Sequence, residues 1–275
     1  MTSPPSSPFV AGLFRYPIKS TAGQALQSVR VGEEGLEADR RYMVAKPDGT
    51  FLTARRYPAL QRIAAEPIEG GLRITHPDLA HIEAREDEFA AEPIATAVWR
   101  DEFDALTTTP ALDEWFSAAL GDPVRLLWVG QRSRRRAGKT GQRLSFADGY
   151  PLLLISQASL GDLNARMPRP QVMAQFRPNL VVSGTEPFAE DGWKRIRIGT
   201  LELAIAASCD RCVMVTIDPA TAAFQPGNEP LRTLSRYRRG PGGILFGQNV
   251  VPLGEGELEV GAPVEVLELA HAAPA

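Results

Sequence analysis

The sequence Ser208-Cys209-Asp210-Arg211-Cys212-Val213-Met214-Val215-Thr216-Ile217-Asp218-Pro219 contains both cysteines of this 275-residue chain. Apolar and β-branched residues on either side favour strands, so we expect the cysteines to lie in β structure. A Cys-x-x-Cys pair suits a redox dithiol, half of a zinc site, or a single thiolate ligand beside an incidental neighbour. A buried, unreactive cysteine is a further alternative. The rest of the chain has to distinguish between them.

Length and composition describe an ordinary globular protein, with 44% hydrophobic and 23% charged residues and a formal charge of -3. This charge gives no reason to expect a nucleic-acid partner. No apolar run approaches the roughly 20 residues that cross a bilayer, and residues 1–8 lack a secretory signal pattern. Two cysteines do not make a disulfide framework, so we expect a cytoplasmic protein without a membrane partner.

Short strands dominate the expected structure before residue 110. Alternating or β-branched apolar runs predict them at 9–16, 25–31, 41–45, 51–53, 62–65 and 71–75. Residues 46–50 carry the turn signals of a hairpin. Many short strands at close spacing are typical of a β-sandwich or barrel.

Three helices are expected later in the chain. Thr109 suits the N-cap of the first, with Pro110 at its first position and Gly121 at its end. Ser156 suits the N-cap of the second, and residues 231–239 form the third. Strands are expected at 124–129, 151–155, 176–184, 190–205, 213–217, 244–252 and 257–267. The fold class is therefore mainly β with a few α-helices.

The surroundings of the two cysteines weigh against two functions. A thioredoxin-type dithiol needs a helix after its cysteines, whereas residues 213–217 favour a strand. The histidines are too few for a zinc site or a Cys–His nucleophile: His76, expected in a turn, His81, and His271, expected in a disordered tail. A thiolate that binds a soft metal held by an organic cofactor remains possible, as does an unreactive cysteine.

Polar residues interrupt the apolar pattern at three places. They are Lys19-Ser20 after Tyr16-Pro17, Arg40 after Asp39, and Arg177 and Asn179 on either side of Pro178. Singly each is an ordinary surface group, but together they suit an anionic ligand with hydrogen-bonding edges. Glycine-rich nucleotide loops and a Gly-x-Ser-x-Gly motif are absent. The charged segment 132–139 is expected to be a solvated, mobile loop, or alternatively an anion or partner contact.

Several motifs in a fixed order resemble one known family. They are Tyr16-Pro17-Ile18-Lys19-Ser20, Asp39-Arg40-Arg41-Tyr42, Thr53-Ala54-Arg55, Phe146-Ala147-Asp148-Gly149-Tyr150-Pro151, Phe176-Arg177-Pro178-Asn179, Cys209-Asp210-Arg211-Cys212 with Thr216-x-Asp218-Pro219, and Leu245-Phe246-Gly247-Gln248. The chain resembles proteins with a MOSC domain preceded by the MOSC N-terminal β-barrel domain, such as mitochondrial amidoxime reducing components and their bacterial relatives. The resemblance implies an N-terminal β-barrel-like domain at 9–125 and a β-barrel MOSC core at 126–270.

The resemblance implies a molybdenum cofactor (Mo-molybdopterin), in which a pterin dithiolene holds molybdenum and one protein cysteine completes the sulfur ligation. Cys212 matches the family's metal ligand, and Cys209 matches a neighbour that is not a ligand. The implied cofactor-binding residues are Lys19, Ser20 and Arg40 at the phosphate, Arg177 and Asn179 at the pterin, Asp210 through its backbone, and Arg211. The match of Asp148 to a cofactor-binding position is looser.

The activity implied by the resemblance is reduction of N-hydroxylated compounds by oxygen-atom abstraction at molybdenum. The sequence lacks the cysteines of the iron–sulfur domain that some bacterial relatives carry, and we expect no membrane anchor of the kind that the mitochondrial relatives carry. We therefore expect a separate reductase or small electron-carrier protein as partner. One alternative is a protein that carries molybdenum cofactor or sulfur without turnover, and another is a cofactor-free redox dithiol.

Overall fold

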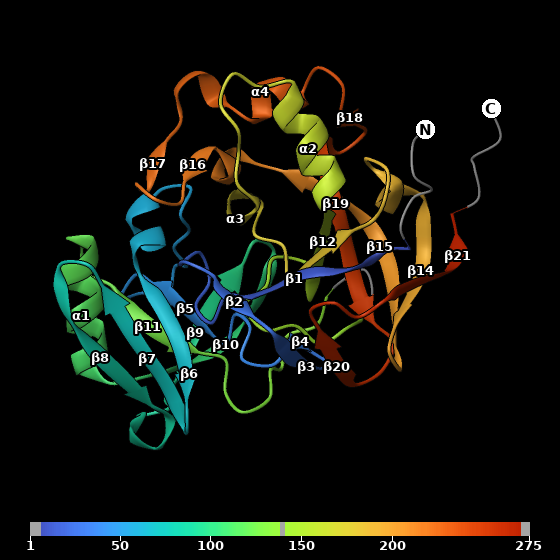
Figure 1. The fold of residues 1–275 in the computed structure, drawn as a ribbon. Helices are drawn as coiled ribbons and strands as arrows, with labels where there is room; N and C mark the ends of the chain where they lie inside the picture. Colours follow the sequence, from blue (N-terminus) through green and yellow to red (C-terminus); the bar gives the residue numbers. More distant parts are fainter. Residues whose placement is uncertain (1–6, 138–140, 271–275) are drawn as a thin grey trace, which may run out of the picture.

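A computed structural model describes residues 7–137 and 141–270 of the chain. Strands make up most of the regular structure in this part, together with four short α-helices (Figure 1). This composition confirms the expected fold class. The helices are α1 (Pro110–Leu120), α2 (Gln157–Ala165), α3 (Met173–Phe176) and α4 (Leu231–Leu234). None of the helices in these residues combines the length and apolar character needed to cross a membrane.

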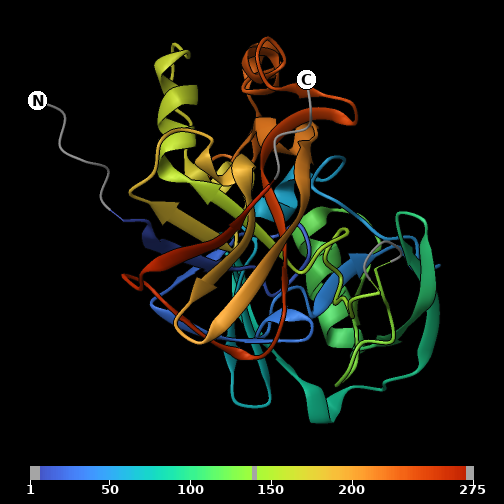
Figure 2. The same ribbon diagram turned by 90° about the vertical axis from the view of Figure 1, so that its right-hand side faces the viewer.

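The largest sheet contains nine strands and curves around one core (Figure 2). Its order is β2 (Gln24–Leu26), β1 (Phe9–Arg15), β13 (Leu180–Ser183), β12 (Leu152–Ser156), β19 (Gly243–Pro252), β15 (Leu201–Arg211), β14 (Trp193–Ile198) and β21 (Val264–Leu269), with β18 (Arg239–Gly240) beside β19. Within this sheet β12 and β13 are parallel, and the other pairs are antiparallel.

Four smaller sheets complete the fold. They are β5 (Tyr42–Ala45), β11 (Arg125–Trp128), β10 (Asp101–Thr107) and β9 (Pro93–Val98); β20 (Gly256–Glu259), β3 (Ser28–Gly32) and β4 (Gly35–Leu36); β6 (Ala64–Ile68), β7 (Gly71–His76) and β8 (Leu79–Arg85); and β16 (Ile217–Asp218) with β17 (Ala223–Phe224). In both views α1 lies with β8 and β11, away from α2 and α4 (Figures 1 and 2).

The beginning of the chain is built into the sheets of its second half. Leu13 on β1 pairs with Leu180 on β13, and β3 pairs with β20. Strand β11, which crosses residue 125, belongs to the sheet of β5, β9 and β10. The division into domains at 9–125 and 126–270 remains a prediction, because sheet pairing joins strands from both sides of this boundary.

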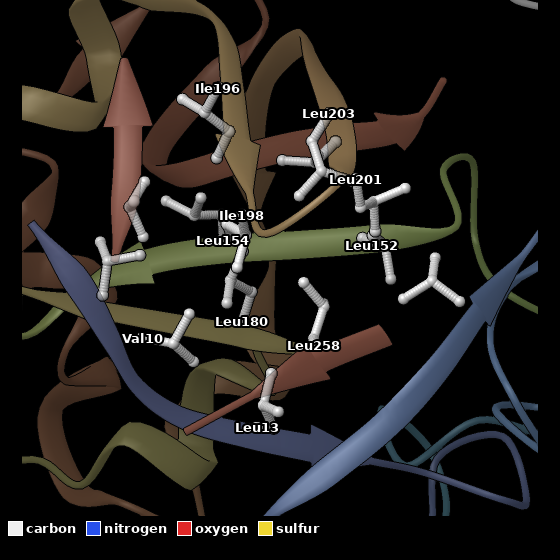
Figure 3. Close-up of a cluster of buried hydrophobic side chains, with 14 of the residues drawn as sticks. Val10, Leu13, Leu152, Leu154, Leu180, Ile196, Ile198, Leu201, Leu203 and Leu258 are labelled. Carbon is white, nitrogen blue, oxygen red and sulfur yellow. The ribbon is translucent and has the colours of Figure 1, made fainter. Parts of the chain in front are cut away.

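Buried aliphatic side chains fill the curve of the large sheet (Figure 3). Val10 and Leu13 from β1 meet Leu154 from β12 and Leu180 from β13, and all four are at most 1% exposed. Burying a side chain of this kind contributes about 1.5–3 kcal/mol relative to leaving it in water. A bulge between Val10 and Gly12 lets both Val10 and Leu13 point into this core, although three positions separate them.

Two helix starts agree with the sequence. Thr109 Oγ1 accepts a hydrogen bond from Leu112 N at 3.4 Å, and Gly121 ends α1 with φ 66°. Ser156 Oγ accepts one from Ser159 N at 3.0 Å at the start of α2. Side-chain acceptors at these positions satisfy amide groups that have no partner inside the helix.

Several expected elements differ in the structure. The strand expected at 176–184 begins only at Leu180, because Phe176 is the last residue of α3 and Arg177 caps that helix in a left-handed conformation. The strand expected at 25–31 is two strands, because β2 pairs with β1 and β3 pairs with β20. Residues 51–53 form only an isolated bridge, between Phe51 and Ala45. The helix expected over 231–239 ends at Leu234, because Arg239 pairs with Ile244 of β19. His271 lies outside the described residues.

Candidate functional site

One cleft is lined by all nine residues that the sequence motifs identified as candidate site residues. They are Lys19, Ser20, Arg40, Asp148, Arg177, Asn179, Asp210, Arg211 and Cys212. Segments from the start, the middle and the last third of the chain thus converge on one place. The structure shows this convergence, whereas the roles of the residues in binding a cofactor remain predictions.

A β-bulge positions the end of β15, where Cys209, Asp210 and Arg211 lie. Ser208 pairs with Gln248 but Asp210 pairs with Leu245, so β19 has an extra residue at this point. Gly247 in the bulge has φ 83°, and a Cβ atom there would lie 2.6 Å from Ile155 Cγ1. Bulges bend the strand that carries the extra residue, so β19 is bent where it pairs with the end of β15, whose Cys209, Asp210 and Arg211 line the cleft.

The segment after Cys212 is not the strand that the sequence predicts. Val213–Thr216 form a short 3₁₀ helix, and Val215 N donates to Cys212 O at 3.2 Å. The buried Val215 belongs to a core cluster with Phe176 and Phe246, which favours this turn over continued pairing. One 3₁₀ turn also differs from the α-helix that follows a thioredoxin-type dithiol.

The two thiols are free and have different surroundings. Cys209 Sγ accepts a hydrogen bond from Arg211 Nη1 at 3.1 Å, and Arg211 Nη2 donates to Phe176 O at 2.6 Å. Cys212 is half-buried and lines the cleft. Arg211 therefore hydrogen-bonds the sulfur of Cys209. No hydrogen bond between Arg211 and Cys212 is present among the described residues.

The cleft carries an excess of positive charge. Five cations line it, namely Lys19, Arg40, Arg55, Arg177 and Arg211, against the two carboxylates Asp148 and Asp210. The whole chain has a formal charge of -3, so this excess is local. Converging guanidinium and ammonium groups favour an anionic ligand with several oxygen atoms.

Lys19 and Asp148 form the ion pair of the cleft. The Lys19 side chain is 6% exposed, and its Nζ donates to Phe146 O at 2.8 Å and to Asp148 Oδ1. Burial lowers the pKa of Lys19 and outweighs the opposing effect of Asp148. Desolvation in the cleft works to raise the pKa of Asp148, but the charge and hydrogen bond of Lys19 outweigh it and hold that pKa well below its ordinary range.

Two arginines lie over the buried ring of Tyr16. Arg177 Cζ is 4.0 Å and Arg40 Cζ 4.8 Å from the ring centroid. Arg40 also pairs with the buried Asp39, whereas Arg177 has no carboxylate within ion-pair distance among the described residues. Burial lowers the pKa of Arg177 to about 10, which still leaves it charged at neutral pH. Arg177 is thus a half-buried cation that donates to Thr21 O and has no carboxylate partner among the described residues.

Three of the cleft residues adopt left-handed backbone conformations. Their φ angles are 70° for Ser20, 49° for Arg40 and 56° for Arg177. Such angles are uncommon outside glycine and cost free energy unless the surroundings impose them. Backbone hydrogen bonds from Arg40 N to Tyr16 O and from Arg177 N to Ala174 O hold two of them. The backbone therefore aims these polar side chains into one cleft.

The charged segment 132–139 was expected to be a solvated loop, but its Arg135 is buried. This residue is 3% exposed, and it donates to Ser145 O at 3.0 Å, to Asp148 O at 2.8 Å, to Asp101 Oδ2 and to Ala147 O. Carbonyl groups of the 145–148 loop and the Asp101 carboxylate compensate its burial. Arg132 and Arg136 are exposed as expected, whereas residues 138–139 lie outside the described residues.

Sequence reasoning missed two further residues of the cleft wall, Arg55 and Trp99. The motif Thr53-Ala54-Arg55 was a signal for the first, since it belongs to the ordered set above. Trp99 follows β9 in a tight turn and has no such signal. Its place in the cleft depends on the pairing of β9 with β10.

The residues of the cleft fit a metal that arrives in an anionic organic cofactor. No group of three or more His, Cys, Asp or Glu side chains that could hold a metal ion by itself occurs in the described ranges. Two half-buried thiols line the cleft, one of which (Cys209) accepts a hydrogen bond from Arg211, together with several cations. Arg211 Nε is buried without a hydrogen-bond partner, which marks a donor available to a ligand.

Comparisons with known proteins agree with these features. The profile of the MOSC N-terminal beta barrel domain matches residues 7–123, and that of the MOSC domain matches residues 141–265. Mitochondrial amidoxime-reducing component 1 of Homo sapiens is 30% identical over 290 residues, covering 94% of this chain and 82% of that protein. Its Danio rerio counterpart is 30% identical over 272 residues, covering 93% and 83%.

A second group of relatives is longer than this chain. The molybdenum cofactor sulfurase of Solanum lycopersicum is 32% identical over 265 residues, which cover 87% of this chain and 32% of that protein. The chain thus spans about a third of the length of this sulfurase. On both domain profiles and on its similarity to relatives of comparable length, the chain belongs to the family of MOSC proteins with a MOSC N-terminal beta barrel domain, which includes the mitochondrial amidoxime-reducing components.

Proposed function

We propose that this protein is a molybdenum cofactor-dependent oxidoreductase that reduces N-hydroxylated compounds with electrons from a separate donor protein. The convergence of nine motif residues on one cation-rich cleft carries this proposal. The names of the amidoxime-reducing relatives support the substrate class. We also propose two domains, 9–125 and 126–270, the second being the cofactor-binding MOSC domain.

The proposed roles follow the chemistry of each side chain. The Cys212 thiolate is the protein ligand of the metal, because a soft thiolate suits molybdenum. Lys19, Ser20 and Arg40 hold the phosphate, and Arg177 and Asn179 hold the pterin. Asp210 contributes its backbone, and Arg211 its buried Nε. When bound, the cofactor supplies the two-electron chemistry that removes an oxygen atom from an N–O bond.

Asp148 acts in this arrangement as a charged partner of Lys19 rather than as a proton donor. Because its pKa lies well below the ordinary range, its carboxyl group is ionised at neutral pH and is a poor proton donor. It balances the charge of Lys19 and accepts the indole N–H of Trp99 at 3.0 Å. The protons that the reduction consumes therefore come from solvent or substrate rather than from Asp148.

The electron donor is proposed to be a separate reductase or small carrier protein. This chain has two cysteines, too few for an iron–sulfur cluster held by four thiolates. One of the two is assigned here to the metal. We further propose a cytoplasmic location, since reducing compartments keep thiols such as these free.

The decisive experiment compares the molybdenum content of the purified wild-type protein, Cys212→Ala and Cys209→Ala. About one molybdenum per chain is expected in the wild type and in Cys209→Ala, and loss of the metal in Cys212→Ala. Reduction of an N-hydroxylated aryl amidine by dithionite-reduced protein is expected to follow the metal content. Full molybdenum and full activity in Cys212→Ala contradict the assignment.

A second candidate is a protein that carries molybdenum cofactor or sulfur without turnover. Identity of 32% to molybdenum cofactor sulfurases favours it. Such a protein retains the cofactor in the metal analysis but reduces no N-hydroxylated compound with any donor. It also transfers cofactor to an apo-enzyme that needs molybdenum, which the reductase is not expected to do.

A further inference from the structure

Arg55 is a cleft cation whose hydrogen-bond donors are available. Its Cζ atom lies 4.1 Å from the ring centroid of Trp99, so the guanidinium stacks on the indole. Stacking uses the face of the guanidinium and leaves its in-plane N–H groups to bind oxygen atoms in pairs. No side chain or carbonyl of the described residues accepts a hydrogen bond from Arg55.

Trp99 is a fixed platform rather than a mobile surface ring. It has φ 60° in the turn between β9 and β10, and its ring meets the Phe51 ring edge-on at 5.2 Å. Its Nε1 donates to Asp148 Oδ1 at 3.0 Å. The side chain is nevertheless 43% exposed. Three contacts thus hold an exposed indole in one orientation, as a preorganised binding group requires.

Trp99 is linked to the ammonium group of Lys19 through Asp148. Asp148 Oδ1 accepts from both Trp99 Nε1 and Lys19 Nζ, so contacts run from Arg55 through Trp99 and Asp148 to Lys19. All four residues line the same cleft. The Lys19 side chain is 6% exposed, and its ammonium group is already bonded to Asp148 and Phe146 O. The guanidinium fork of Arg55 is therefore the group on this wall that can bind an oxyanion, as such forks do in phosphate and carboxylate sites.

We propose that Arg55, stacked on Trp99, is an oxyanion-binding subsite of the cleft. Its ligand is a phosphate or carboxylate group with at least two free oxygen atoms. Two sources have this chemistry, the phosphate of a cofactor and a carboxylate on the substrate. Deciding whether the bound group belongs to the cofactor or to the substrate rests on the proposed function. Oxyanion binding at Arg55 does not rest on it.

The first test measures pyrophosphate binding by calorimetry to full-length protein produced in cells that do not make molybdenum cofactor. Arg55→Gln is expected to weaken binding at least tenfold, and Trp99→Leu several-fold because the stack is lost. Arg56→Gln is the matched control, because Arg56 is the exposed next residue and its replacement changes the net charge equally. Equal weakening by Arg55→Gln and Arg56→Gln, or no weakening by either, overturns the subsite.

The second test identifies the source in protein that contains molybdenum. A lower molybdenum content in Arg55→Gln than in Arg56→Gln assigns the subsite to the cofactor phosphate. Unchanged molybdenum with a raised KM for a carboxylated N-hydroxylated aryl amidine, but not for its neutral parent, assigns it to the substrate. Unchanged metal content, together with KM values in Arg55→Gln that equal those of the wild type for both compounds, overturns the assignment of the subsite to either source. Absence of molybdenum from the wild type refutes the proposed function and leaves the pyrophosphate result standing.

Discussion

Arg40 Nη1 donates a hydrogen bond to Asn179 Oδ1 at 2.9 Å, although 139 positions separate the two residues in the sequence. The same amide oxygen accepts from Leu153 N at 3.3 Å, and the amide nitrogen donates to Phe14 O at 3.1 Å. Asn179 is 1% exposed. This single amide therefore joins β1, β12 and the loop of Arg40 at the wall of the cleft.

Replacing Asn179 by Ala tests this junction. The change leaves the buried Leu153 N–H and Phe14 carbonyl without this partner and releases the Arg40 guanidinium. We expect a loss of about 2–3 kcal/mol in the free energy of unfolding, since each buried group left unsatisfied costs roughly 1–3 kcal/mol. Urea denaturation followed by circular dichroism measures it. Glu114→Ala, an exposed change on α1, serves as the control and is expected to stay within about 0.5 kcal/mol.

Replacing Arg135 by Ala is expected to cost about 3 kcal/mol, because it removes charge-assisted hydrogen bonds to buried carbonyl groups. The 145–148 loop also presents Asp148 and the Phe146 carbonyl to Lys19, so molybdenum content is expected to fall as well. Arg136→Ala is the matched control, because that side chain is 55% exposed. Equal stability of the two variants contradicts the structural role given to Arg135.

Gly247→Ala tests the bulge beside Cys209. A left-handed backbone with a Cβ atom 2.6 Å from Ile155 Cγ1 and 2.8 Å from Leu154 O cannot be accommodated without a shift. The expected loss is about 2–3 kcal/mol in thermal or urea unfolding. Gly254→Ala provides the comparison, since no atom lies within 4 Å of its Cβ position. A Gly247→Ala protein as stable as Gly254→Ala refutes the constraint.

The pH dependence of stability reports on Asp148. Its folded-state pKa lies below the unfolded value of about 4, so the unfolded chain binds the proton more readily. The stabilising contribution of the carboxylate is complete above the unfolded pKa and is lost as the pH falls through the folded value. We expect the difference in unfolding free energy between wild type and Asp148→Asn to be constant from pH 5 to 7. It is expected to shrink below about pH 4, as urea titrations at stepped pH measure, and a difference that stays constant to pH 2 contradicts the ion pair.

Local signals in the sequence predicted the elements that local contacts stabilise. The start and end of α1 follow from Thr109, Pro110 and Gly121, because each residue acts on backbone groups within one helical turn. The candidate site residues were identified from the ordered family motifs rather than from the hydrophobic pattern of the sequence. The convergence of those motif residues on one cleft could be seen only in the structure.

Features that depend on distant partners were not predictable. Arg135 has the composition of a solvated loop, and its burial results from Asp101 and from carbonyls about ten residues further on. The stack of Arg55 on Trp99 depends on a hairpin turn that brings the indole to the cleft. The β-branched residues after Cys212 favour a strand locally, but packing of Val215 in the core overrides that preference.

The pairing of β1 with β13 has a consequence for biosynthesis. During translation Leu13 leaves the ribosome long before its partner Leu180 exists, and β3 waits still longer for β20. Sheets with such distant partners close late and slowly. The nascent chain therefore leaves one edge of β1 unpaired until β13 has been made and one edge of β3 unpaired until β20 has been made. The complete cleft forms only after both pairings are in place. Any cofactor that requires the assembled cleft must be inserted post-translationally.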